Sequence, residues 1–387
     1  MTRFQILDTL LHFLAFYIGA GIGSFLNVVI YRLPLGISVN NPKRSFCPSC
    51  KYQIPMWQNI PLLSWLLLRG KCANCSGKIS IRYFMVELLT GVMFYLVFLK
   101  VSGEYSNVDP WPYIKIWGPQ VLCLWVFMSL LISGMFIDID HFILPHTITI
   151  GGAVVGVLAS WWVPALVDQV THTRGLLISL ASAALGLGGL WLVVELGKLA
   201  FGRKKFVFEK DESWEVTQPD DNEPPVVVFG EHNYGWADLF MRATDRMVVS
   251  CNELQVNERT FGTVTAELWM EKLKVRDGSS LEEFALEGVK ILKAKVTQVV
   301  IPREAMGFGD VLFLMMIGAF TGWQAVLFTI LAASVLGTVF AVIHRVTGKA
   351  EWGAKIPFGP YLAMGAVIWV FYGPQFVEWY VSKTMWR

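Results

Sequence analysis

Long apolar segments recur along the chain and are separated by shorter polar connections. Eight of these segments approach the length of about 20 predominantly apolar residues that an α-helix needs to cross a bilayer. The sixth and seventh are the least clearly separated. The pattern predicts a polytopic α-helical membrane protein with about eight transmembrane helices. The predicted helices cover residues 8–31, 83–101, 118–137, 145–163, 176–201, 309–322, 324–344 and 357–373.

The pattern changes between residues 202 and 304, where short β-favouring runs alternate with turn-forming stretches. Runs such as KFVFEK, PPVVVFG and DRMVVS predict strands, while QPDDNEPP and DGSS predict turns. One helix is expected near SLEEFALEGVKIL, residues 280–292. We therefore predict a small, mainly β cytoplasmic module inserted between two membrane regions. The expected domains are 1–31 (first transmembrane helix), 32–82 (cytoplasmic loop domain), 83–205 (helices two to five), 206–299 (inserted module) and 300–387 (helices six to eight).

Composition and charge agree with this interpretation and add an orientation. Hydrophobic residues make up 54% of the 387 positions, which is too many for an ordinary soluble enzyme. The segment from Arg32 to Arg82 contains eight Lys or Arg residues and no Asp or Glu. By the positive-inside rule this segment is cytoplasmic. The first apolar segment lacks a basic flank and a small-residue cleavage site, so it is expected to remain as a membrane helix.

Two C-x2-C pairs lie in the basic segment, Cys47 with Cys50 and Cys72 with Cys75, separated by 21 residues. Each pair can direct two thiolates at one ion, and together they predict a tetrahedral four-cysteine zinc site. The alternative is a pair of disulfides, but a cytoplasmic location disfavours it. The intervening NIPLLSWLLLRG is too short to cross a membrane and is expected to lie along its face.

Two acids stand at the ends of predicted helices. Asp138 ends the third helix just before Pro145 opens the fourth, and Asp310 begins the sixth helix from the same side of the membrane. Ionisable groups at membrane depth are costly and are commonly functional, although each acid could simply cap a helix end. Gly307 and Gly309 would let the backbone turn tightly and allow a substrate strand to approach. Two facing carboxyl groups are the smallest set of catalytic side chains that an aspartic protease needs.

Helix polarity suggests a division of roles for this pair, with Asp310 as the base that activates water and Asp138 as the acid. A metal site is the other interpretation of this region. The spacing of its acids and histidines matches no helical metal motif. Its ligands would be drawn from Asp138, Asp140, His141 and His146.

These motifs, taken together, resemble the bacterial type IV prepilin peptidases, which are leader peptidases and N-methyltransferases of the GxGD aspartic protease class. The resemblance covers residues 10–205 and 300–373. In the family's pattern the first catalytic Asp stands seven residues before the proline of the LP block, which selects Asp138, and the second is the Asp of GxGD, Asp310. The matching blocks are GIGSFLNVVIYRLP, the cysteine pairs, NIPLLSWLLLRGKC, ISIRYFMVELLTG, IDIDHFILP, PREAMGFGD and IPFGPYLAMGA.

The resemblance implies cleavage of the basic leader from type IV prepilins or pseudopilins at the cytoplasmic face of the bacterial inner membrane. It also implies methylation of the new N-terminal residue from S-adenosylmethionine. The family associates methylation with the cysteine-bearing domain, which makes Gly70, Lys71 and the cysteines candidates for that step. Glu87, beside the basic loop, is expected to pair with a nearby Lys or Arg. Leu312 and His146 depart from the usual family residues but do not touch the two acids.

The inserted module is far longer than the family's ordinary connection. It is either a tolerated surface insertion or a docking domain for substrate or for the pilus or secretion assembly machinery. Expected partners are prepilins or pseudopilins and membrane lipid, with no nucleic acid. The rival interpretations are a leader peptidase without methyltransferase activity and, from a different class, a zinc-stabilised membrane transporter or scaffold.

Overall fold

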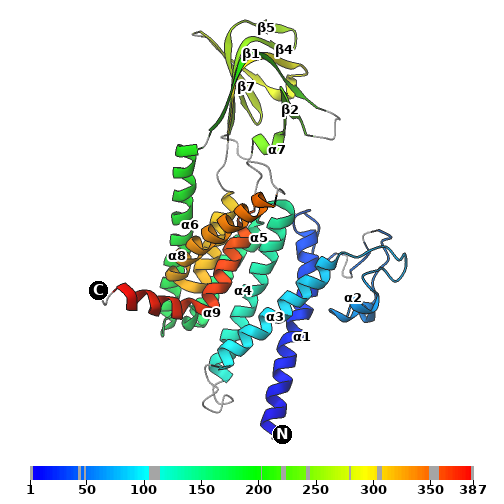
Figure 1. Cartoon of the computed structure of the whole chain (residues 1–387), viewed down its shortest axis with the longest axis vertical. Helices are drawn as coiled ribbons and strands as arrows, with labels where there is room; N and C mark the ends of the chain where they lie inside the picture. The colour runs from blue at the N-terminus through cyan, green and yellow to red at the C-terminus, as the bar shows by residue number, and fades with distance from the viewer. Residues whose placement is uncertain are drawn as a thin grey trace. The chain divides into compact units, whose positions relative to one another are not determined.

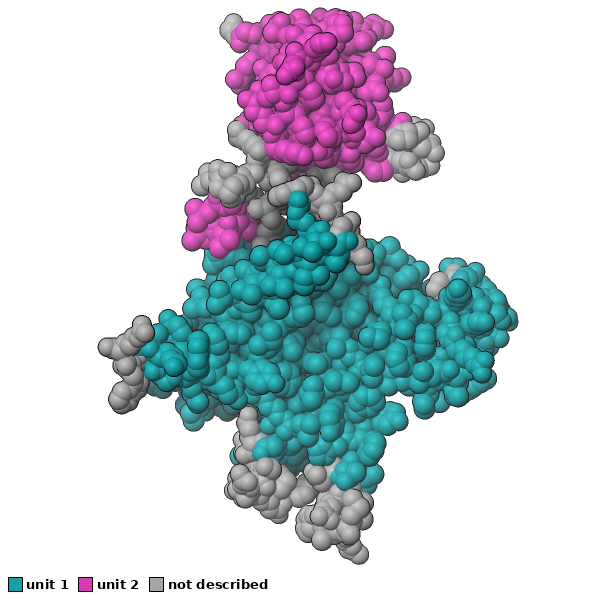
Figure 2. Space-filling model, viewed as in Figure 1, with its two compact units in different colours: residues 1–191, 307–387 teal, residues 192–306 magenta. Residues whose placement is uncertain are grey.

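The structure is a computed structural model that describes residues 3–41, 45–47, 49–103, 114–201, 203–218, 224–240, 245–278, 280–302, 307–347 and 357–384. The chain forms two compact units (Figures 1 and 2). The first is helical and contains residues 1–191 and 307–387. The second contains residues 192–306 and is mainly β. The mainly β region predicted in the middle of the chain is therefore confirmed.

Every predicted apolar segment overlaps a helix of the structure. Five described helices are long and apolar enough to cross a membrane, while α5 is shorter, with 17 residues. The five lie within α1, α3, α4, α6 and α8. The long helices are α1 (Arg3–Arg32), α3 (Ile81–Gly103), α4 (Ile114–His141), α5 (His146–Trp162), α6 (His172–Phe201), α8 (Phe308–Val346) and α9 (Gly359–Thr384).

The sixth and seventh predicted segments are the two halves of α8. This helix has 39 residues and would be about 58 Å long if straight, nearly twice the thickness of a bilayer core. It breaks at Gly322, whose φ of 84° and ψ of 173° are conformations that favour glycine. A continuous apolar run therefore contains two helical segments with different directions.

The helices pack in neighbouring pairs. Helix α1 lies against α3, and α4 contacts both α3 and α9 (Figure 1). Helix α8 lies against both α5 and α9. The approach of α1 to α3 depends on Gly19 and Gly23. A Cβ on either glycine would come within 2.7 Å of α3 atoms. Small residues of this kind allow membrane helices to pack closely through van der Waals contact.

The connection from α1 to α3 forms a separate small substructure, the cysteine loop, which comprises residues 33–80. It contains a 3-10 helix at Met56–Gln58 and the short helix α2 at Leu63–Leu67. Its apolar side chains around these helices are exposed, including Met56, Trp57 and Leu67. The expectation that this part lies along the membrane face stays a prediction, and these exposed side chains suit it.

The described residues of the second unit form one antiparallel sheet of nine strands, which is curved (Figure 1). The strand order is β3-β2-β1-β9-β4-β6-β7-β8, and β5 also pairs with β4. Buried and less buried side chains alternate along β2 and β6 and over most of β4, and the buried side chains of the unit form one core. The strands are β1 (Arg203–Thr217), β2 (Val226–Phe229), β3 (His232–Gly235), β4 (Arg246–Val256), β5 (Arg259–Phe261), β6 (Val264–Trp269), β7 (Lys272–Asp277), β8 (Ser280–Ala285) and β9 (Leu292–Pro302).

The helix expected near residues 280–292 is wrong. Residues Ser280–Ala285 form strand β8, which pairs with β7, and only a 3-10 turn follows at Leu286–Gly288. Cross-strand charges favour this pairing, because Glu283 lies between Lys272 and Lys274. Hydrogen bonds from Lys272 and Lys274 lower the pKa of Glu283. Pairing with a neighbouring strand has overridden the helix-like spacing of apolar residues.

Candidate active site and cysteine centre

The structure places Asp138 and Asp310 in the same part of the helical unit. Asp138 lies in the last turn of α4, and Asp310 lies in the first turn of α8. Both side chains are buried, with 5% and 7% of their surface exposed. The two carboxyl groups are near enough for a direct electrostatic interaction. Two acids that are 172 positions apart in the sequence are therefore neighbours.

A third helix supports Asp138. The backbone N–H of Gly359, the first residue of α9, donates a hydrogen bond of 2.9 Å to Oδ2 of Asp138. The approach is so close that a Cβ on Gly359 would lie 2.7 Å from the same oxygen. Sequence reasoning did not select Gly359 as a site residue. The available signal was the Gly-Pro pair at the start of an apolar run.

Asp310 has a different environment. Its Oδ1 is buried and has no hydrogen-bond partner among the described residues. Its Oδ2 faces Gly307, where an added Cβ would lie 3.6 Å away in ordinary contact. Gly307 has φ −68° and ψ 145°, which any residue can adopt. The absence of a side chain there leaves space beside the carboxyl group rather than permitting a special turn.

Gly309 has a clearer structural role. A Cβ at this position would lie 2.9 Å from Cβ of Leu144, in the connection between α4 and α5. Leu144 is buried and also packs over Gly134 of α4. The sequence suggested that this glycine admits a substrate strand. The structure shows that the space is filled by the protein's own LP block, which locks the start of α8 against the end of α4.

The remaining residues near the acids form ordinary structural contacts. Pro145 precedes α5, and its carbonyl oxygen accepts hydrogen bonds from the N–H groups of Ile148 and Thr149. Asp140 forms an ion pair with Arg82 of α3. Among the described residues, Asp138, Asp140 and the two nearby histidines do not form a group that could hold one ion. The structure thus gives no support to the alternative metal site.

The four paired cysteines do form such a group. The ligand atoms of Cys47, Cys50, Cys72 and Cys75 all lie within 4.8 Å of one another, and the thiols are not joined as disulfides. Two of the separations, Cys47 to Cys75 and Cys50 to Cys72, are 3.9 Å. Zinc–sulfur bonds of about 2.3 Å in a tetrahedron place sulfur atoms about 3.8 Å apart. The predicted four-cysteine cluster is confirmed, and its geometry fits one zinc ion.

Two similar hairpins carry these cysteines. In each, the N–H of the first cysteine donates to a carbonyl five residues later, Tyr52 for Cys47 and Gly77 for Cys72, at 2.9 Å. Lys51 and Ser76, each directly after the second cysteine, have φ near 57°. The turn aims both thiols of a hairpin in the same direction. The local backbone therefore fixes each half of the cluster.

The thiols differ in how readily they ionise. The backbone N–H of Cys50 is the main cause that lowers the pKa of Cys47 to about 6, and the N–H of Tyr52 likewise lowers the pKa of Cys50. Although the N–H of Gly77 lowers it, interaction with Cys50 and its neighbours raises the pKa of Cys75 to about 11. Four thiolates at this separation repel one another unless a cation compensates their charge. The donor set thus suits a divalent metal.

Glu87 of α3 lies where the cysteine loop meets α1 and α3. Its Oε2 accepts a hydrogen bond of 2.7 Å from the N–H of Leu62, and Ser24 of α1 supplies a hydroxyl contact. Among the described residues, the partners of Glu87 are thus neutral groups and not the expected Lys or Arg. Arg82, the nearby cation, is paired with Asp140.

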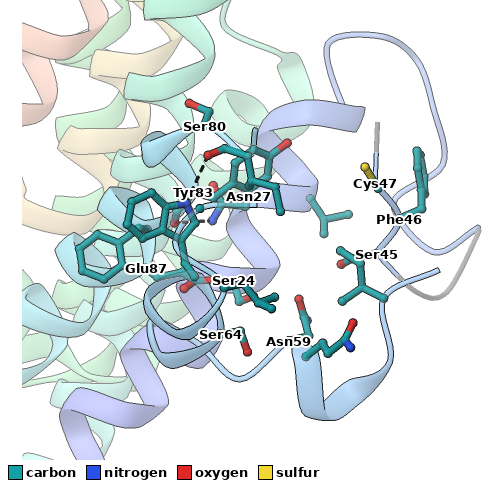
Figure 3. Close-up of a pocket in the computed structure, with 18 of the residues that line it drawn as sticks. Ser24, Asn27, Ser45, Phe46, Cys47, Asn59, Ser64, Ser80, Tyr83 and Glu87 are labelled. Atoms are coloured by element: carbon teal, nitrogen blue, oxygen red, sulfur yellow. Dashed lines mark hydrogen bonds between the residues drawn. The ribbon is translucent and has the colours of Figure 1, made fainter. Parts of the chain in front are cut away.

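The residues suggested for methyl transfer lie at the same junction. Gly70 and Lys71 both line a cavity of about 390 Å³ between the cysteine loop and helices α1 and α3 (Figure 3). Gly70 has φ of 65°, a conformation that favours glycine. A Cβ there would lie 2.8 Å from the ring of Trp65. Gly70 is therefore needed both for the turn and for the position of this tryptophan.

Two family models match the chain. The bacterial peptidase A24 N-terminal domain matches residues 17–101, which include the second half of α1, the cysteine loop and most of α3. The type IV leader peptidase family matches residues 125–208 and 275–342. The second match contains both Asp138 and Asp310 and omits residues 209–274 of the β unit.

Curated relatives extend this similarity over nearly the whole chain. The prepilin leader peptidase/N-methyltransferase of Stutzerimonas stutzeri is 28% identical over 392 residues, covering 95% of this chain and 93% of the relative. Proteins of the same name are 35% identical in Neisseria gonorrhoeae, over 49% of this chain and 67% of the relative, and 43% identical in Myxococcus xanthus, over 37% and 38%. No solved structure is significantly similar. The chain belongs to the type IV leader peptidase family.

Proposed function

We propose that this protein is a membrane aspartic endopeptidase that removes the basic leader from type IV prepilins or pseudopilins. The observation that carries the proposal is the meeting of two buried acids, Asp138 and Asp310, at adjoining ends of α4 and α8. Relatives named prepilin leader peptidase/N-methyltransferase support the same activity, because this chain is similar to them over more than nine-tenths of their length.

The chemistry follows from the proximity of the two acids. Like charges at short range do not both ionise, so the pair shares one proton. The ionised acid takes a proton from water as the water oxygen bonds to the scissile carbonyl carbon, and the other acid gives its proton to the carbonyl oxygen. The carbon–nitrogen bond then breaks: the leaving amine takes a proton from the pair, and one of the two hydroxyl groups now on the carbon returns a proton to it, so the pair again holds one proton. The space beside Gly307 is where water and the peptide would approach Asp310.

Helix polarity does not separate the roles of the two acids as the sequence suggested. Asp138 ends α4, but it also accepts a backbone N–H at the start of α9. Asp310 lies at the start of α8. Both carboxyl groups therefore lie at the positive end of a helix. We assign the shared proton to the pair as a whole and no fixed role to either acid.

We assign a structural zinc ion to Cys47, Cys50, Cys72 and Cys75. Bound zinc would tie the two hairpins together in a loop whose described residues include few buried apolar side chains. The ion would have no part in peptide cleavage. The cysteines would hold the wall of the cavity in which Gly70 and Lys71 lie.

We further propose that the mature N-terminus is methylated. S-adenosylmethionine supplies the methyl group, which the amine nitrogen accepts as it releases a proton, leaving a neutral thioether. Gly70 and Lys71 belong to the cavity that we connect with this step. A leader peptidase without methyltransferase activity is the alternative, and mass spectrometry of the mature N-terminus distinguishes the two.

The proposed location is the bacterial inner membrane, with the acids and the cysteine loop at the cytoplasmic face. The eight basic residues between Arg32 and Arg82 support this orientation. Membrane lipid would surround the helical unit. For the β unit we retain two proposals, a tolerated insertion and a docking domain for substrate or assembly machinery.

Co-expression with a prepilin tests the proposed function. We expect the full-length protein to convert the prepilin to a shorter product, and Asp138→Asn to leave it uncleaved. Asp168→Asn is a matched control, because Asp168 follows α5 and its left-handed φ of 54° suits asparagine. Cleavage by the Asp138→Asn variant would refute the acid pair. Absence of cleavage by the unmodified protein would favour the transporter or scaffold interpretation.

A further inference from the structure

The cavity beside Glu87 has the properties of a small-molecule site. Its volume of about 390 Å³ lies in the range of roughly 300–1,000 Å³ that is usual for such sites. Figure 3 shows Asn27, Tyr83 and Glu87 on the helices along one side, and Phe46 and Cys47 of the cysteine loop along the other. The walls therefore come from the membrane helices and the cysteine loop together.

A carboxylate with neutral partners lines this cavity. Glu87 is held by the N–H of Leu62 and the hydroxyl of Ser24, and neither contact compensates its charge. Leu62 adopts φ 63° and ψ −51°, which is unfavourable for a leucine. The chain thus accepts backbone strain where an N–H orients this carboxylate. An anion oriented in this way is suited to a cationic ligand.

Aromatic rings surround the same space. Phe46, Trp65, Tyr83 and Phe84 all line the cavity, and the Trp65 and Phe84 rings lie 5.3 Å apart. The indole N–H of Trp65 lies 3.4 Å from the carbonyl oxygen of Ile79, which fixes the ring. Aromatic faces attract organic cations and stack on planar bases. A ligand with a fixed positive charge and an aromatic base matches both groups of residues.

Positive charge is present at another part of the cavity lining. Lys71 and Lys78 both line it and are paired across the second cysteine hairpin. Two ammonium groups on residues that are paired in this way suit a carboxylate. The lining therefore combines an anion, aromatic faces and cations, which are the complements of a sulfonium, an adenine and an amino-acid carboxylate.

We propose that this cavity binds S-adenosylmethionine, with Glu87 facing the sulfonium and Lys71 and Lys78 facing the carboxylate. The inference rests on the proposed methyltransferase function and names the residues that hold the donor. It predicts that the cavity binds S-adenosylmethionine in preference to its product. S-adenosylhomocysteine, the product, lacks the positive sulfur but keeps the adenine and carboxylate, so Glu87 contributes to binding of the donor and not to binding of the product.

Equilibrium binding of both ligands to the purified full-length protein tests this assignment. We expect Glu87→Gln to weaken S-adenosylmethionine binding about tenfold, a change of about 1.4 kcal/mol, and S-adenosylhomocysteine binding less than about threefold. Glutamine keeps an oxygen that can accept the Leu62 N–H. Lys78→Gln, at an exposed side chain, is expected to weaken both ligands equally. Glu378→Gln, on the exposed surface of α9, is the matched control and should change neither affinity.

Equal effects of Glu87→Gln on both ligands, or no effect on either, would overturn the assignment. Binding of a prepilin peptide in the cavity, with no binding of S-adenosylmethionine there, would also overturn the assignment. Zinc content and prepilin cleavage, measured on the same preparations, report folding of each variant. If the Glu87→Gln protein still cleaves and methylates prepilin and its preference between the two ligands is unchanged, the assignment of this cavity is refuted while the proposed function stands. Failure of the unmodified protein to process any prepilin would refute the proposed function.

Discussion

The acid pair and the cysteine centre are assembled in opposite ways. Each cysteine pair is shaped by a hairpin whose hydrogen bonds span five residues, so half of the cluster forms from a short piece of chain. Asp138 and Asp310 have no such local frame. They meet because α4, α8 and α9 pack together, and a donor from the third helix holds one of them. The cysteine cluster is thus defined by local structure, and the acid pair by tertiary packing.

The difference also appears in hydrogen bonding. Backbone N–H groups lie beside the thiols of the cysteine hairpins. Asn74 adds N–H contacts to the sulfurs of Cys72 and Cys50. One oxygen of Asp310 is buried without a partner among the described residues. A buried unpaired oxygen is costly for folding and is suited to a reacting partner. The hydrogen bonding of the cysteine cluster therefore favours stability, whereas that of the acid pair favours reactivity.

The largest effect is expected from Asp310→Asn. The variant should lower the rate of prepilin cleavage by about 10⁴-fold, because both steps of the proposed reaction need the shared proton. Asp140→Asn should lower the rate less than about tenfold, since its partly exposed ion pair with Arg82 contributes on the order of 1 kcal/mol. Single-turnover cleavage of a prepilin in detergent measures both. Equal losses would show that the choice of Asp138 over Asp140 is wrong.

Metal removal should separate the two regions. Chelation, or Cys72→Ser, is expected to remove about one zinc per chain and to abolish binding of S-adenosylmethionine, because one wall of its cavity is lost. Prepilin cleavage should fall less than about tenfold, since the acids are held by helices. Metal analysis and cleavage assays on the same samples measure this. Cys123→Ala, in α4, is the control and should retain the metal.

Failure of that separation has two forms. Loss of cleavage in parallel with zinc would mean that the cysteine loop supports the acid pair. Intact disulfides without metal would overturn both the zinc assignment and the cytoplasmic location of the loop.

An intermediate effect is expected from Gly359→Ala. The added methyl group would lie 2.7 Å from Oδ2 of Asp138, so either α9 or the carboxyl group must move. Displacement of a catalytic group by about 1 Å can reduce kcat by about 10²-fold. Gly188→Ala, in α6, meets no atom within 4 Å and should leave kcat unchanged. An active Gly359→Ala enzyme would show that this hydrogen bond is unimportant for catalysis.

These outcomes bear on what could be predicted from the sequence. The cysteine cluster was predictable because its spacing is local and its chemistry belongs to the side chains. The pairing of the acids required helix directions as well. Gly359 was missed because its donor is a backbone N–H, and the Glu87–Leu62 contact because a leucine gives no sign of its unusual φ. The helix expected over residues 280–292 was wrong because pairing with β7 decides that segment.

The smallest effect concerns a cysteine in the β unit. Burial raises the pKa of Cys251 to about 12, the opposite of the shift at Cys47. A raised folded pKa means that its stabilising contribution is complete below pH 9 and is lost as the pH rises through about 12. At pH 10 the unfolding equilibrium should be about tenfold less favourable to the folded unit than at pH 8.

Hydrogen exchange of β4 amides in the full chain measures this pH effect. Cys251→Val provides the reference, because valine fills the site and does not titrate. The ratio of exchange rates between the two proteins cancels the intrinsic pH dependence of exchange. A ratio that stays constant from pH 8 to pH 10 would contradict the burial argument.

The bond from Gly359 to Asp138 has a consequence for how incomplete genes of this kind should be judged. A coding sequence that stops after residue 350 still encodes both acids, the four cysteines and the whole region matched by the family models. Its product would lack the N–H that positions the first acid. Motif content alone would classify such a gene as intact, whereas the geometry predicts a protein that inserts into the membrane and does not process its substrate.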